Sequence, residues 1–96
     1  MAEMASLIEA ARVLCYRAAW LVDQGKIDPK LISMAKWFGG EVAVKVIDEV
    51  VQIHGGYGYL GEYGIERLYR DAKLVEIVEG TKEIEKVIIA RELLSR

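Results

Sequence analysis

Glu79 is the residue of this sequence whose setting most strongly suggests chemistry. It directly precedes Gly80 and Thr81, and Thr81 can cap a helix that begins there. The Glu79 carboxylate would then lie at the positive end of that helix dipole, where an ordinary glutamate stabilises the helix and does nothing further. A catalytic role would need an apolar pocket that partly desolvates the carboxylate, and the neighbouring Ile77 and Val78 make such a pocket conceivable.

A glycine- and tyrosine-rich stretch, residues 54–64, is the second candidate. It contains the spacing G-x-G-x-x-G at Gly56, Gly58 and Gly61. A dinucleotide fingerprint needs a strand before these glycines, whereas a long helical pattern precedes them here, which argues against a Rossmann site. Two interpretations remain, a turn that ends a helix and an open backbone that a ligand can approach closely. His54, the single histidine, cannot build a zinc site alone, and we interpret it as a residue that packs in this loop.

Helical patterns position both candidates. Apolar residues recur at spacings of three and four in four segments, about 2–24, 29–53, 65–73 and 81–94. Asp28 and Pro29 are typical of a helix start, because aspartate caps free N–H groups and proline fits the first turn. No segment alternates convincingly with period two. The sequence therefore predicts one all-α domain over residues 1–96, an antiparallel helical bundle of three long helices and one short helix.

The same spacing predicts which side chains face the core. The inward stripe of the first segment is Leu7, Ala11, Leu14, Ala18 and Leu21. The inward set of the last segment is Ile84, Val87, Ile88 and Leu94. Cys15, the single cysteine, is expected to be a small core residue. Gly39 and Gly40 interrupt the second segment at a cost of about 1 kcal/mol each relative to alanine, so we expect another helix to approach closely there.

Composition excludes several classes of protein. The chain has 96 residues, is 53% hydrophobic and 29% charged, and carries a net charge of −2. It is too apolar for a disordered tail, lacks the roughly 18 consecutive apolar residues of a membrane span, and has no basic block for nucleic acid. Neither a metal site nor a hydrolytic triad is indicated. The high apolar fraction suggests that a neighbouring subunit or domain covers part of the surface.

Several ordered motifs resemble the C-terminal domain of the acyl-CoA dehydrogenases. They are QIHGGYGY at 52–59, ERLYRDAK at 66–73, VEGTKEI at 78–84 and IAR at 89–91, with EAAR and RAAW at 9–12 and 17–20. The likeness covers essentially the whole chain. It implies a C-terminal four-helix bundle whose first helix, like the preceding β domain and N-terminal domain, is absent from this sequence.

The resemblance also implies an activity. The family consists of FAD enzymes that oxidise an acyl-CoA to the trans-2-enoyl-CoA, with a glutamate removing the α-proton while the β-hydrogen leaves as hydride to the flavin. That base maps onto Glu79, and a substrate contact maps onto Gly80. The expected FAD contacts map onto Thr81, Lys82 and Glu83, and, for the FAD of a neighbouring subunit, onto Gln52, Ile53, His54, Gly55 and Gly56. Lys82 and Glu85 stand where relatives often carry small or amide residues. We therefore expect FAD to be contacted here through backbone atoms rather than through side chains.

The implied partners are an acyl-CoA, an electron-transfer flavoprotein and further copies of the chain in a dimer or tetramer. Neither nucleic acid nor a membrane is expected as a partner, and the expected location is the cytoplasm, or the mitochondrial matrix in a eukaryote. We expect the isolated chain to bind FAD weakly or not at all and to turn over no acyl-CoA. The alternative is a non-catalytic helical module that self-associates, and the presence of Glu79 argues against it.

Overall fold

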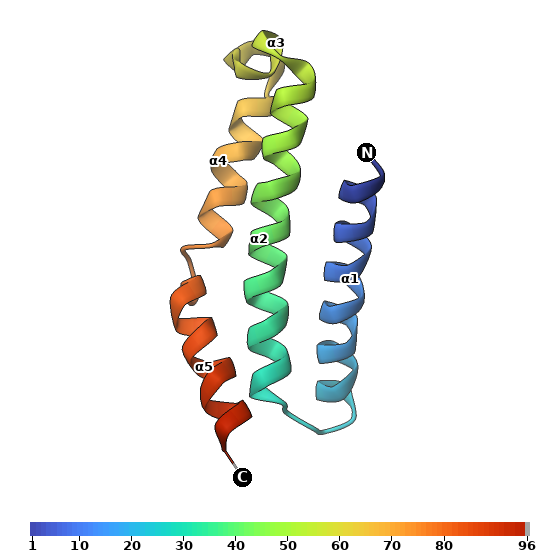
Figure 1. Ribbon diagram of the computed structural model, residues 1–96, viewed down its shortest axis with the longest axis vertical. Helices are drawn as coiled ribbons and strands as arrows, with labels where there is room; N and C mark the ends of the chain where they lie inside the picture. Colours follow the sequence, from blue (N-terminus) through green and yellow to red (C-terminus); the bar gives the residue numbers. More distant parts are fainter. Residues whose placement is uncertain (96) are drawn as a thin grey trace.

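A computed structural model describes residues 1–95 and shows helices joined by short turns (Figure 1). The helices are α1 (Ala2–Asp23), α2 (Pro29–His54), α3 (Gly56–Tyr59), α4 (Ile65–Val75) and α5 (Lys82–Leu94), with a 3-10 helix, η1 (Gly61–Tyr63), between α3 and α4. No strand occurs among residues 1–95, and the all-α prediction is confirmed.

The long helix α2 lies at the centre of the molecule. Figure 1 shows α1 antiparallel to it on one side, and α4 and α5 following each other along its other side. In the part of the chain that the structure describes, α1 contacts neither α4 nor α5, because α2 separates them. The helices therefore form an elongated array of 51 × 24 × 20 Å, which is open at both outer faces.

Local signals begin and end the helices where the sequence predicts. The Asp28 carboxylate accepts a hydrogen bond from the backbone N–H of Leu31 at 3.2 Å, which caps α2. The Thr81 hydroxyl accepts one from Ile84 N–H at 3.3 Å, which caps α5. Gly25, with φ +78°, follows the end of α1 in the left-handed conformation that suits glycine best.

The core is small and lies between α1 and α2. Ala18, Leu31 and Ala35 are buried there, and Leu14 and Leu21 pack against them while partly exposed. The inward stripe predicted for the first segment thus faces α2. The outer side of α1 carries exposed apolar side chains: Val13, Tyr16, Trp20 and Val22. In residues 1–95 no helix combines the length and apolar character needed to cross a membrane.

Two predictions of burial are wrong. Cys15 is exposed, because it falls outside the stripe that faces α2. In α5, Ile84, Val87 and Leu94 are 53%, 62% and 83% exposed, while the charged Glu85 is buried. The reason is that α5 packs on α2 and on no other helix of residues 1–95, so a single narrow side of α5 is covered.

Candidate functional site

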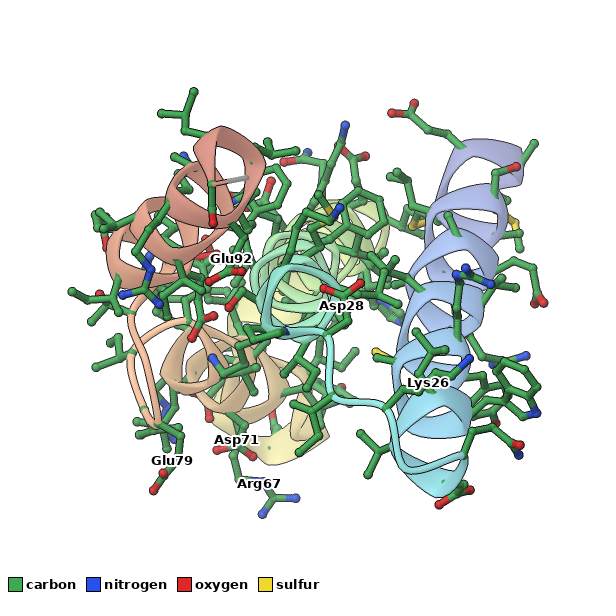
Figure 2. All side chains as sticks on the ribbon, turned by 90° about the horizontal axis from the view of Figure 1, so that it is seen from below. Lys26, Asp28, Arg67, Asp71, Glu79 and Glu92 are labelled. Carbon is green, nitrogen blue, oxygen red and sulfur yellow. The ribbon has the colours of Figure 1, made fainter. Side chains whose placement is uncertain are left out.

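Glu79 lies in the turn that joins α4 to α5. Its φ of +58° makes it the one non-glycine residue with positive φ among residues 1–95, and Gly80 follows with φ +114°. A left-handed conformation at a residue with a Cβ costs about 1–3 kcal/mol and persists where the surroundings over-determine it, often at functional sites. Figure 2 shows the Glu79 side chain at the outer edge of the molecule, pointing away from α2. The strained backbone therefore presents a carboxylate to the outside.

The apolar pocket that the sequence makes conceivable is not closed by this chain. Ile77 and Val78 flank Glu79, but their own side chains are 55% and 42% exposed. They can form one wall of a pocket. Desolvation of the Glu79 carboxylate would need surfaces from outside residues 1–95.

A cluster of charged side chains holds the start of the turn. Glu76, buried at 7% exposure, accepts a hydrogen bond from Lys73 Nζ at 3.0 Å, and Lys82 Nζ lies 3.6 Å from the same oxygen. Lys82 also donates to Glu41 of α2 at 3.3 Å. The hydrogen bond from Lys73, helped by the charges of both lysines, keeps the pKa of Glu76 below its ordinary value although burial opposes this. The pKa of Lys82 is raised, mainly by its hydrogen bond to Glu41 and the charge of that residue.

Lys36 of α2 contacts the backbone at both ends of the same turn. Its Nζ donates to the carbonyl oxygen of Val75 at 2.5 Å and to that of Gly80 at 3.3 Å. Next to it on α2, Gly40 lets the turn come close: a Cβ on Gly40 would lie 3.3 Å from Cγ of Glu76, whereas a Cβ on Gly39 would meet nothing within 4 Å. The predicted close approach is thus confirmed at Gly40 and absent at Gly39.

Gly80 is required by its packing as well as by its φ. A Cβ there would collide with Oε1 of Glu85, the buried carboxylate one turn into α5. The backbone N–H groups of Lys82 and Glu83 belong to the first turn of α5, where N–H groups have no partner within the helix.

The glycine-rich stretch folds into two short helices and has an open outer surface. Residues 54–64 form α3 and η1, where the rings of Tyr57 and Tyr63 pack edge to face with centroids 5.6 Å apart. A Cβ on Gly58 would lie 2.8 Å from the carbonyl oxygen of Val51, so this glycine is packed inward. Residues 52–56 are exposed, and the Nδ1 atom of His54 lies 2.9 Å from the carbonyl oxygen of Val50.

The predicted site residues fall into two groups within one chain. Residues 79–83 are continuous in the turn and the start of α5, whereas residues 52–56 lie at the end of the molecule, beyond α4 (Figure 1). The eleven residues of α4 make it about 16 Å long. The two groups therefore do not form one site in a single copy. A shallow groove of ≈ 300 Å³ beside the glycine-rich stretch is lined by Val51, Tyr59, Glu66, Tyr69 and Arg70.

The backbone of Gly55 and Gly56 is open to the outside. A Cβ on Gly55 or Gly56 would meet no atom within 4 Å, so another molecule can approach this backbone closely. At the other group, the Lys82 ammonium is engaged by Glu41 and Glu76, which leaves its backbone N–H as the available donor. Within residues 1–95 no three histidine, cysteine or carboxylate side chains are placed to hold a metal ion.

Sequence reasoning missed the side chains that hold the turn: Lys36, Glu41 and Glu76. One signal was available. Lys36 and Gly40 are four residues apart, so they lie on one face of a helix that is otherwise largely apolar. A lysine one turn before a glycine on an apolar helix face indicates that a polar segment of the chain packs against that face. The pattern does not identify the segment.

Known proteins resemble the chain over nearly all of its length. The family model described as "Acyl-CoA dehydrogenase, C-terminal domain" matches residues 1–94. Cyclohexane-1-carbonyl-CoA dehydrogenase of Syntrophus aciditrophicus is 50% identical over 93 residues, which are 97% of this chain and 24% of the relative.

Two solved structures show the same fold. A chain from the structure of the electron transferring flavoprotein of Acidaminococcus fermentans matches with a TM-score of 0.96 and 46% identity, over 100% of this chain and 25% of that one. An FAD complex of PigA matches with a TM-score of 0.88 and 35% identity, over 93% of this chain and 23% of that one. This chain spans about a quarter of the length of the curated relatives it matches.

Proposed function

This chain belongs to the acyl-CoA dehydrogenase family, and from that membership we propose that it supplies the base, Glu79, for the oxidation of an acyl-CoA to the trans-2-enoyl-CoA. The observation that carries the proposal is the left-handed backbone of Glu79, in a turn whose two ends accept hydrogen bonds from Lys36 of α2. A glutamate with no special role gains nothing from this strain. A base that must reach a substrate does gain from it.

The proposed chemistry makes strict demands on the carboxylate. A proton α to a thioester is a weak acid, so the base must be placed at the α-carbon and kept from water, and donors must stabilise the charge that develops on the thioester oxygen. In this chain the turn presents Glu79, and the adjoining Gly80 would contact the substrate. The remaining walls would come from the three quarters of the relatives' length that this chain does not match.

Two backbone surfaces would hold FAD, which supplies a hydride acceptor when bound. We propose that Thr81, Lys82 and Glu83 contact it through the N–H groups at the start of α5. Gln52, Ile53, His54, Gly55 and Gly56 would contact the FAD of a second copy. The distance between the two groups within one chain supports this division, as does the open backbone of Gly55 and Gly56.

The proposed partners follow from the same family. They are an acyl-CoA, an electron-transfer flavoprotein as electron acceptor, and further copies in a dimer or tetramer. The exposed apolar side of α1 supports assembly, because apolar surface of this kind is stabilised by being covered. It equally supports the alternative of a self-associating module without catalysis, so the two must be separated by an activity test.

That test is a chimera in which this chain replaces the matched segment of the Syntrophus aciditrophicus relative. We expect the chimera to bind FAD and to reduce a dye with cyclohexane-1-carbonyl-CoA. Glu79→Gln should keep the flavin absorbance but lower kcat roughly 100- to 10,000-fold, the usual contribution of a general base. Full activity of a flavin-loaded Glu79→Gln chimera would refute the assignment and favour the module. The 96-residue chain alone should bind little FAD and show no turnover.

A further inference from the structure

We propose that Lys36 is a positioning residue for Glu79, because its ammonium group holds both ends of the turn from Val75 to Gly80. The inference rests on the proposed role of Glu79 as a base and assigns to α2 the task of aiming it. Lys36 does not touch the substrate in this proposal. It acts through the backbone of the turn.

The geometry of the two hydrogen bonds carries the inference. Lys36 Nζ lies 2.5 Å from the carbonyl oxygen of Val75, the last residue of α4, and 3.3 Å from that of Gly80, which immediately precedes the cap of α5. A single charged donor thus joins two points of the chain that are five residues apart. Glu79 lies between them and adjoins the second.

The ammonium group also completes the end of α4. The carbonyl oxygens of Lys73 and Leu74 accept hydrogen bonds from backbone N–H groups of the turn. The next carbonyl, that of Val75, is the one that Lys36 satisfies. A cation is favourable at the negative end of a helix, and a hydrogen bond from a charged donor is roughly twice as strong as a neutral one.

The turn needs a contact of this kind because the Glu79 backbone would otherwise return to a negative φ. Its positive φ is the less stable choice for a residue with a Cβ, so fixed ends are required to maintain it. Glu76 anchors the start of the turn through Lys73 and Lys82, but its carboxylate cannot donate a hydrogen bond to the carbonyl oxygen of Gly80. Among residues 1–95, Lys36 is the hydrogen-bonding side chain that reaches both ends.

The first experiment compares Lys36→Met with Lys45→Met in the 96-residue chain by NMR. Lys45 lies on the same helix and pairs with Glu3 of α1 at 3.1 Å, far from the turn, so it is a matched control. We expect Lys36→Met to shift the backbone resonances of residues 78–82 and to speed amide hydrogen exchange there. Lys45→Met should leave them unchanged. If the resonances of residues 78–82 are the same in Lys36→Met as in the parent chain, the proposal is wrong.

The second experiment places the same variants in the chimera. Lys36→Met should lower kcat per bound flavin roughly 10- to 100-fold, because misplacing a reacting group by about 1 Å can cost on the order of 100-fold. Exchange of the substrate α-hydrogen with deuterium from solvent should slow by the same factor, while KM stays close to that of the parent. Lys36→Arg, which keeps the charge and the donors, should recover part of both rates.

The outcomes separate the two proposals. A purely structural role for Lys36 would lower thermal stability and flavin content but leave kcat per bound flavin and deuterium exchange unchanged, and that result overturns the inference. If Glu79→Gln stays active, the proposed function fails by itself, and the role of Lys36 in catalysis falls with it. If Glu79→Gln is inactive and Lys36→Met is as fast as the parent, only the positioning role is refuted.

Discussion

Alanine at Gly39 and at Gly40 should have opposite effects on stability, although the two glycines are neighbours in one helix. Each substitution gains about 1 kcal/mol of helix propensity, because alanine loses less backbone entropy than glycine in α2. At Gly39 the new methyl group meets no atom within 4 Å, so this gain should appear in full. Gly39→Ala should therefore raise the free energy of unfolding by about 1 kcal/mol.

At Gly40 the same gain in helix propensity is opposed by a steric contact with the turn between α4 and α5. The new Cβ would lie 3.3 Å from Cγ of Glu76, closer than the roughly 3.5–4.0 Å of a relaxed carbon contact. Glu76 is buried and paired with Lys73 and Lys82, so it cannot swing away freely. Overpacking of a fixed neighbour costs about 1–3 kcal/mol, which predicts a net loss of up to about 2 kcal/mol for Gly40→Ala.

Urea unfolding of the 96-residue chain, followed by far-ultraviolet circular dichroism, measures both values. The slope against urea should stay constant, so that a midpoint shift reports stability. Combining Gly40→Ala with Glu76→Ala, which removes Cγ, should recover most of the overpacking cost, and this coupling identifies the contact. If Gly40→Ala stabilises the chain as much as Gly39→Ala does, the packing of the turn on α2 is incorrectly described.

Two further predictions concern the same turn. Glu79→Gly should raise the free energy of unfolding by about 0.5–1 kcal/mol, since relief of the left-handed conformation contributes about 1–2 kcal/mol and the entropy of glycine takes back part of it. Glu83→Gly, at an ordinary helical position, should lower it by about 1 kcal/mol in the same urea assay, and a loss at both positions would contradict the strain at Glu79. Because Lys73 lowers the pKa of Glu76 below 4.5, this carboxylate stabilises the fold above that pH and ceases to do so as pH falls through its lowered pKa. The deficit of Glu76→Gln relative to the parent, measured by urea unfolding between neutral and acid pH, should therefore shrink below pH 4.5, and a deficit that does not change with pH would argue against the ion pairs.

The helix boundaries could be predicted because short-range physics decides them. Asp28 and Thr81 cap helices whose first N–H groups lie within three residues, and Pro29 is compatible with a first helical turn whatever the rest of the chain does. These signals act before any tertiary contact forms. They can therefore be identified from the sequence alone.

Burial in α5 could not be predicted because a distant segment decides it. The spacing of Ile84 and Val87 indicates an apolar face, but α2 covers the side that carries Glu85. Likewise, no local sequence signal indicates that Glu79 adopts a positive φ, because the following Gly80 is the residue expected to do so. The turn conformation follows from Lys36, which is 43 residues away from Glu79 in the chain.

The charges around the turn explain how the carboxylate of Glu79, the proposed base, can remain unpaired beside several lysines. Lys36, Lys73 and Lys82 all lie at this turn, and an unengaged ammonium group there would pair with Glu79 and occupy the carboxylate. Each is instead engaged elsewhere, the first by backbone carbonyls and the other two by carboxylates of Glu76 and Glu41. Within residues 1–95 the Glu79 carboxylate consequently forms no ion pair. Lys82 is thus compatible with the proposed base because its ammonium group is engaged by Glu41 and Glu76.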